Sequence, residues 1–158
     1  MRSFQIHNVI YDFEIVLLLV MKSIVAIKVV VQFNDVDMLG HVNNARYLTY
    51  FEMARTEYLY SKSQTMSIGD VGVIIARAEI DYKFPAKWHD ELTISMRTSS
   101  VGKSSWTYEY TVVREKDNKL IATGKTVQVA YDYKKGVPLA LPDDLKDRLN
   151  QEVEQTSA

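Results

Sequence analysis

The stretch that decides the fold begins at Phe33 and reads F-N-D-V-D-M-L-G-H-V-N-N as far as Asn44; it continues as A-R-Y-L-T-Y-F-E-M-A-R to Arg55. Its first half is polar and holds two aspartates, which is typical of a loop. Its second half places apolar side chains at helical spacing, and Asn43 or Asn44 can cap the start of a helix. We therefore predict a helix over about Ala45–Tyr60, directly after a loop that carries carboxylates and an imidazole.

The predicted helix is apolar around most of its circumference. The side chains that recur at helical spacing, or widen that stripe, are Tyr47, Leu48, Tyr50, Phe51, Met53, Ala54, Tyr58 and Leu59. A helix of this kind is usually buried. We therefore expect other elements of the fold to enclose it.

The rest of the chain predicts strands and a short C-terminal helix. β-Branched and alternating apolar residues mark strands at 24–33, 71–84, 91–101, 104–115 and 120–133. Short turns join the later strands, which must therefore pair antiparallel. Pro142 and two aspartates open the last helix, with Leu145, Leu149 and Val153 as its inner stripe. The fold class is α+β: one curled antiparallel sheet of about five strands around a long central helix.

Length and composition restrict the domain organisation and the class of protein. The chain of 158 residues carries a net charge of -1 and no cysteine. One domain is expected over 21–158, and residues 1–20 are expected to be an extension outside it. The apolar run Ile15–Met21 is too short to span a membrane, which takes about 20 residues. The charge balance argues against nucleic-acid binding, and the lack of cysteine fits a cytoplasmic location.

The loop before the helix holds the candidate catalytic groups. The N-terminus of a helix presents unpaired N–H groups and a partial positive charge, which can stabilise a carbonyl oxygen as it becomes negative. Asp37 is a candidate base or nucleophile, and His41 can orient it or a water molecule. Asp35 fits a structural role better. Glu52, a minor candidate for a second carboxylate, is spaced to pair with Arg55.

The pattern D-x-D-x-x-G-H-V-N-N-x-x-Y-x-x-[YF]-x-E-x-A-R resembles that of the hotdog-fold acyl-CoA thioesterases, which include the 4-hydroxybenzoyl-CoA thioesterase group and the plant acyl-carrier-protein thioesterases. The resemblance covers about Ile24–Tyr133. It implies that Asp37 attacks the thioester carbonyl or activates water, and that a backbone N–H at about Asn44 polarises that carbonyl. His41 matches the histidine of the H-V-N-N motif in the plant enzymes.

The resemblance also implies how the substrate is held. Coenzyme A carries phosphates, and the residues expected to contact the substrate are Asn43, Tyr47, Lys83, Lys103 and Ser104. Coenzyme A is then part of the substrate, and no separate cofactor is expected. No metal site is expected either, because the three histidines are scattered along the chain. One sheet around one helix encloses little volume, so we expect the pocket to form between subunits of a homodimer or homotetramer.

Several functions remain open at this point. The first hypothesis is an acyl-CoA thioesterase that releases a free acid and a thiol. The sequence differs from individual family branches at Phe33, Leu39 and Asn44, which favours, as an alternative, a non-catalytic protein that binds acyl thioesters. An acyl-carrier-protein thioesterase is a further alternative. An enoyl-CoA hydratase is disfavoured because its aspartate–histidine motif is missing.

Overall fold

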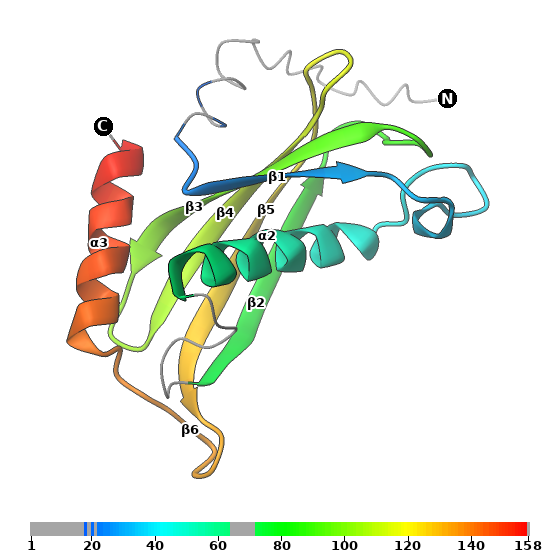
Figure 1. Ribbon diagram of the computed structural model, residues 1–158. Coiled ribbons are helices and arrows are strands. Elements are labelled where there is room, and N and C mark those ends of the chain that lie inside the picture. Colours follow the sequence, from blue (N-terminus) through cyan, green and yellow to red (C-terminus); the bar gives the residue numbers. More distant parts are fainter. Residues whose placement is uncertain (1–17, 19, 21, 64–71, 158) are drawn as a thin grey trace, which may run out of the picture.

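The computed structural model of the chain describes Leu18, Val20, residues 22–63 and residues 72–157 (Figure 1). The described elements follow one another in the order β1 (Val25–Val30), η1 (Phe33–Asp35), α2 (Arg46–Ser63), β2 (Gly72–Tyr82), β3 (Glu91–Val101), β4 (Ser105–Arg114), β5 (Lys119–Asp132), β6 (Val137–Pro138) and α3 (Asp143–Ser157). The first seventeen residues, which hold most of the predicted extension, lie outside the described part.

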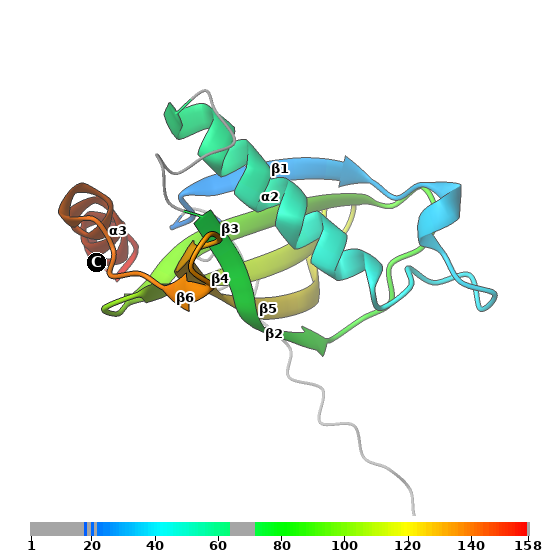
Figure 2. The same cartoon turned by 90° about the horizontal axis from the view of Figure 1, so that it is seen from below.

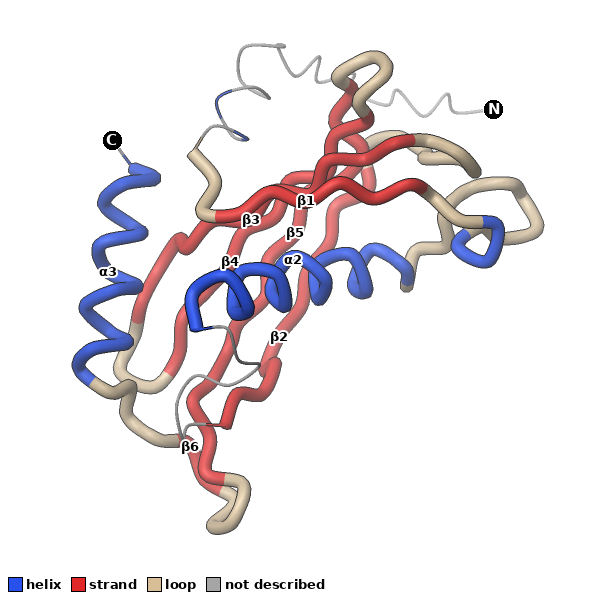
Figure 3. The backbone as a smooth tube through the Cα atoms, viewed as in Figure 1, coloured by secondary structure: helices blue, strands red, loops and turns tan. Residues whose placement is uncertain are grey.

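The strands form one antiparallel sheet in the order β1-β3-β4-β5-β2, and the short β6 pairs with β5. The helix α2 crosses the concave face of this curved sheet (Figures 1 and 2). The tube in Figure 3 shows the same separation, with a single long helix lying across the strands. The predicted α+β architecture is thus confirmed.

The hydrophobic core lies between α2 and the concave face of the sheet. Each central strand turns alternate side chains inward, and the largest of these are Leu92, Ile94, Met96, Trp106, Tyr108 and Tyr110. The helix contributes the buried side chains Tyr47, Tyr50, Phe51, Ala54 and Tyr58. These positions recur at helical spacing, so one face of α2 supplies them all.

The opposite face of α2 is not covered within the described chain. Leu48 is 42% exposed and Met53 is 43% exposed. The expectation that the helix is enclosed over most of its circumference is therefore wrong for a single chain. A sheet touches a helix along one stripe only, and the remaining apolar side chains need another partner to be buried.

Several element boundaries differ from the predicted ones. The first strand ends at Val30, and Phe33–Asp35 form a 3₁₀ turn instead of continuing it. The helix α2 extends to Ser63, three residues beyond the predicted Tyr60. The C-terminal helix is longer than expected, at 15 residues.

The helix α3 packs its inner stripe against the end of the sheet. Leu145 and Leu149 are buried, as predicted, and Glu152 is also buried between them and β3. Its carboxylate accepts hydrogen bonds from the hydroxyls of Tyr58 on α2 and Thr98 on β3. Among the described residues, no helix is both long enough and apolar enough to cross a membrane.

Candidate active site

The polar loop before α2 is a small hairpin. Val36 and Val42 face each other in an isolated antiparallel bridge, and the Asp37 N–H donates to the His41 carbonyl at 2.8 Å. The Gly40 N–H closes the turn on the Asp37 carbonyl at 3.0 Å. Gly40 has a φ of 75°, which residues with a Cβ rarely adopt, so glycine fits this turn. The hairpin thus presents Asp37 beside the start of α2.

The two oxygens of Asp37 have different surroundings. Its Oδ1 accepts the N–H groups of Leu39 at 2.8 Å and His41 at 3.3 Å. Its Oδ2 has no hydrogen-bond partner among the residues that the structure describes. The side chain is half-buried. One oxygen therefore caps the turn, while the other is available to a substrate or a water molecule.

The start of α2 supplies a backbone donor close by in the sequence. Asn43 caps this end, since its Oδ1 accepts the Ala45 N–H at 2.9 Å and its carbonyl accepts the Arg46 N–H at 2.9 Å. The exposed Asn44 donates its N–H to no other described residue, while its carbonyl accepts the Tyr82 hydroxyl at 3.0 Å. A free N–H at a helix start can bind an oxyanion.

Two buried aspartates hold this region in place. Asp35 is 4% exposed, and Arg46 donates from Nε to its Oδ1 at 2.6 Å. Asp90 is also 4% exposed and is paired with Arg114 at 3.2 Å and Lys116 at 2.5 Å. Burial by itself would raise the pKa of each carboxyl, but the hydrogen bonds and cations lower both pKa values below the usual range.

The adjoining β2–β3 loop is joined to the hairpin through the main chain. The Val42 N–H donates to the Ala86 carbonyl at 2.9 Å, and the Val31 N–H donates to the Asp90 carbonyl at 2.9 Å. The network around Asp90 and Arg114 therefore supports the hairpin through the β2–β3 loop. No local sequence pattern predicts this network, because its members lie on separate elements.

The remaining predicted site residues at this end lie in different surroundings. His41 is half-buried. Tyr47 is 3% exposed and packs edge-on against Tyr50 and Tyr82, and burial raises its pKa to about 12. Lys83 follows directly after β2, and its Nζ lies 3.9 Å from an Asp81 carboxylate oxygen.

Lys103 and Ser104 lie at the opposite end of the sheet. Their turn joins the paired residues Val101 on β3 and Trp106 on β4. Trp106 lies opposite Gln128 on β5, and Gln128 lies opposite Ile75, near the start of β2. The Asp37 hairpin lies instead near Tyr82, at the far end of β2. One chain therefore does not bring Lys103 and Ser104 to Asp37, although the resemblance groups them in one site.

The expected pairing of Glu52 with Arg55 is not observed. Arg55 instead donates to the Tyr110 hydroxyl at 3.0 Å, and Tyr110 also shares a hydrogen bond with Thr126. Both helix residues are on α2, but the arginine side chain turns toward the sheet. Glu52 is exposed.

An apolar rim near the hairpin was not anticipated. Phe33 is 73% exposed and meets Trp88, 50% exposed, in an edge-on contact with ring centroids 5.6 Å apart. Met38 and Leu39 at the hairpin tip are 103% and 80% exposed. These residues lie in loops or in the short 3₁₀ turn η1, where no periodicity marks an apolar face.

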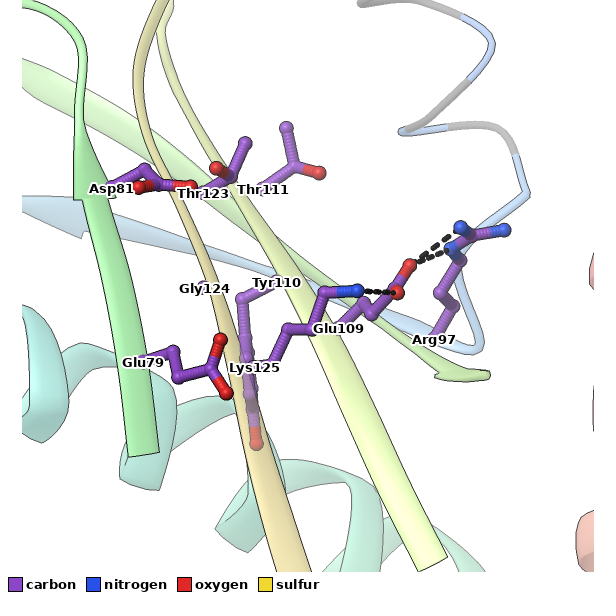
Figure 4. Close-up of a pocket in the computed structure, with 9 residues that line it drawn as sticks. All are labelled: Glu79, Asp81, Arg97, Glu109, Tyr110, Thr111, Thr123, Gly124 and Lys125. Carbon is purple, nitrogen blue, oxygen red and sulfur yellow. Dashed lines mark hydrogen bonds and ion pairs between the residues drawn. The ribbon is translucent and has the colours of Figure 1, made fainter. Parts of the chain in front are cut away.

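The convex face of the sheet carries a separate groove of about 200 Å³ (Figure 4). Three of its charged side chains are paired with one another, because Glu109 binds both Arg97 at 2.5 Å and Lys125 at 2.8 Å. None of the predicted site residues lines it. Across the described residues, no group of three or more His, Cys, Asp and Glu side chains is placed to hold a metal ion.

Known proteins are similar to this chain in both sequence and fold. The profile of the thioesterase-like superfamily matches residues 31–149. The long-chain acyl-CoA thioesterase FadM of Escherichia coli is 30% identical over 119 residues, covering 74% of this chain and 90% of FadM. The acyl-CoA thioesterase YbgC of Haemophilus influenzae is 33% identical over 121 residues, covering 73% of this chain and 87% of YbgC.

A solved thioesterase of Thermus thermophilus, crystallised with coenzyme A and zinc, has the same fold. It is 35% identical, with a TM-score of 0.71 over 80% of this chain and 98% of that one. The curled sheet, the single long helix and the carboxylate hairpin define a hotdog-fold protein of the thioester-hydrolase class. The chain belongs to the thioesterase-like superfamily, and the resemblance to the hotdog thioesterases is confirmed.

Proposed function

We propose that the protein hydrolyses acyl-CoA thioesters, with Asp37 as the catalytic carboxylate and the Asn44 N–H as an oxyanion donor. The protein is a thioester hydrolase, as its superfamily and its acyl-CoA thioesterase relatives support. The observation that carries the residue assignment is a pair of atoms at one hairpin–helix junction, Asp37 Oδ2 and the Asn44 N–H, that have no hydrogen-bond partner in the described part of the chain.

The reaction forms one bond to oxygen and breaks one bond to sulfur. In the first route, the Asp37 carboxylate takes a proton from water as the water oxygen bonds to the thioester carbonyl carbon. The C–S bond of the resulting intermediate breaks, and the leaving thiolate takes up that proton from Asp37. In the second route, the carboxylate itself attacks, and the C–S bond breaks as the anhydride forms and the thiolate leaves; water then hydrolyses the anhydride and supplies the proton that the thiolate takes up. In both routes, the Asn44 N–H donates to the carbonyl oxygen as it becomes negative.

A second copy of the chain is proposed to complete the site. Strand β2 is 11 residues long and pairs with β5 on one side only, so within the described chain its other edge is unpaired. Ile75 is 45% exposed, and the outer face of α2 exposes Leu48 and Met53. A long, apolar edge strand is a template for pairing with another chain. The other edge strand, β1, has only 6 residues.

Antiparallel pairing of β2 with β2 of the second copy would reverse the second sheet. The β3–β4 turn of that copy would then lie toward the end that carries Asp37, about three strand spacings, or roughly 14 Å, from the seam. In this arrangement Lys83 of one chain and Lys103 and Ser104 of the partner subunit contact the phosphates of one coenzyme A. His41, Asn43 and Tyr47 support the hairpin and the helix start beside the acyl group.

Coenzyme A enters this scheme as part of the substrate and not as a cofactor. The thiol carrier could instead be the phosphopantetheine arm of an acyl carrier protein, which presents the same thioester. We place the protein in the cytoplasm, a reducing compartment that suits a chain without cysteine.

A panel of short, long and aromatic acyl-CoAs in a thiol-release assay tests this function. We expect saturable release of thiol with at least one member of the panel. Saturable binding of every member with no thiol release would support the non-catalytic alternative. A parallel panel of acyl carrier proteins loaded with the same acyl groups identifies the carrier by the larger kcat/KM.

A further inference from the structure

Asp35 is a buried acid that the proposed chemistry does not use. Both oxygens of its carboxylate are engaged, by three hydrogen bonds and one further ion-pair contact. Arg46 donates its Nε–H to Oδ1 at 2.6 Å, and its Nη2 lies 2.5 Å from the same oxygen. The Gln32 N–H and the Tyr50 hydroxyl donate to Oδ2, at 2.9 and 3.0 Å. An acid that is buried and saturated in this way cannot itself reach a substrate.

The main chain of Asp35 forms the base of the catalytic hairpin. Its carbonyl accepts the Asn43 N–H at 2.8 Å, immediately before the Val36–Val42 bridge. Asp37 is therefore two residues along one arm of a hairpin that closes at Asp35 and Asn43. A shift of this base would move the Asp37 carboxylate with it.

The side chain of Asp35 holds the other half of the site. Arg46 is the first residue of α2, and Tyr50 lies one turn further on the same face. Both donate to Asp35, so the start of the helix is tied to the base of the hairpin. The same residue thus connects the part that carries Asp37 to the part that carries the Asn44 N–H.

The charge of Asp35 is neutralised by Arg46. A buried carboxylate without a cation beside the helix start would oppose the negative charge that forms on the thioester oxygen. The Arg46 guanidinium removes this conflict, because its Nε and Nη2 both lie within 2.6 Å of Asp35 Oδ1.

We propose that Asp35 is a positioning residue for thioester hydrolysis, which sets the separation between the Asp37 carboxylate and the Asn44 N–H through Arg46 and Tyr50. The proposal rests on the proposed roles of Asp37 and Asn44. It predicts that loss of the Asp35 contacts slows the chemical step and leaves substrate binding intact. A misplacement of about 1 Å can cost about 10²-fold in rate.

The first test is Asp35→Asn, which keeps the shape and removes the charge. We expect kcat to fall about 10- to 100-fold at a temperature well below unfolding. We expect the Kd of a non-hydrolysable thioether analogue of the best acyl-CoA to stay within about twofold, because the substrate contacts lie on other residues. An unchanged kcat in the folded variant would overturn the proposal.

A matched pair of tyrosines on α2 separates positioning from stability. Tyr50 and Tyr58 are both 2% exposed, and each hydroxyl donates to a buried carboxylate, Asp35 or Glu152. The two lie eight positions apart, or about 12 Å along the helix, and only Tyr50 is near the hairpin. Tyr50→Phe and Tyr58→Phe should lower the denaturation midpoint to a similar extent.

Only Tyr50→Phe should lower kcat, by about threefold or more, with the analogue Kd unchanged. Equal kcat values in the two variants would overturn the proposal, and this pair decides the question even if Asp35→Asn does not fold. The proposed function fails separately: wild-type protein without thiol release, or Asp37→Asn with normal turnover, would contradict it. If only Asp37→Asn slows turnover, the proposed function stands and the role of Asp35 is structural.

Discussion

The ring of Phe51 on α2 is stacked on the ring of Tyr110 on β4, with centroids 4.2 Å apart and an interplanar angle of 11°. The stack reaches the sheet because the neighbouring position on β5 is Gly124. A Cβ built on Gly124 would lie 2.4 Å from Cε2 of Phe51. Space, and not backbone conformation, therefore favours glycine at this position.

Gly124→Ala should destabilise the fold. The added methyl group must displace the Phe51 ring, and overpacking of this kind costs about 1–3 kcal/mol of unfolding free energy. Urea denaturation followed by circular dichroism measures this change. The double variant with Phe51→Leu should lose less stability than the sum of the single variants. Additive losses would show that the two side chains do not compete for space.

Asp37→Asn should abolish most of the hydrolysis and leave the fold intact. A general base contributes about 10²- to 10⁴-fold, and the amide cannot accept the proton. Thiol release gives kcat, and circular dichroism reports the fold. Asp81→Asn is the control, since that carboxylate is 75% exposed and lies on β2 outside the hairpin. Wild-type turnover in Asp37→Asn would contradict the assignment.

Acid should destabilise the protein through Asp35 and Asp90. The pKa of each is lower in the folded protein than its unfolded value of about 3.9. Each carboxylate therefore stabilises the fold above that pH, and its contribution disappears as the pH falls through the folded pKa. We expect the unfolding free energy to decrease from about pH 5 downward.

Denaturation curves at a series of pH values measure this decrease. Asp90→Asn should be less stable than the wild type at neutral pH but should lose less stability on acidification. If its unfolding free energy has the same acid dependence as that of the wild type, Asp90 is not a source of that dependence.

Ile75→Lys should weaken the proposed dimer. A lysine on an edge strand opposes pairing with a second copy. Sedimentation velocity should show a shift toward monomer, with a parallel loss of thiol release because the site would be incomplete. Val30→Lys is the matched control, since Val30 is 46% exposed on the other edge strand, β1. A dimer that tolerates Ile75→Lys and dissociates with Val30→Lys would place the interface on β1.

The local pattern was sufficient for most elements of the fold. Alternation of apolar residues located β3 over Glu91–Val101 as the structure has it, and helical spacing identified the buried face of α2. The 3₁₀ turn at Phe33 was missed, because β-propensity continues through that residue. The exposed stripe at Leu48 and Met53 was also missed, since an apolar side chain does not reveal whether one chain or two will cover it.

In the candidate site, too, some features were predicted from the local pattern and others were missed. The D-x-D motif singled out Asp37 and the helix start, because both lie within a few residues of each other. The partners of Asp35 and Asp90 were not identified, since Tyr50 lies 15 positions and Arg114 lies 24 positions away in the chain. Lys103 was grouped with Asp37 by resemblance, although one chain places the two at opposite ends of the sheet.

The amino-acid sequence by itself determined the order and type of the main elements, and it placed a carboxylate beside a helix start. Side-chain periodicity and capping act over a few residues, so they can be recognised locally. Only the tertiary structure decided which acids are buried. It also decided which oxygen of Asp37 lacks a partner, and which surfaces of α2 and β2 lack a cover, among the residues that the structure describes. Those properties depend on strand register and on the packing of residues far apart in the chain, which no local pattern contains.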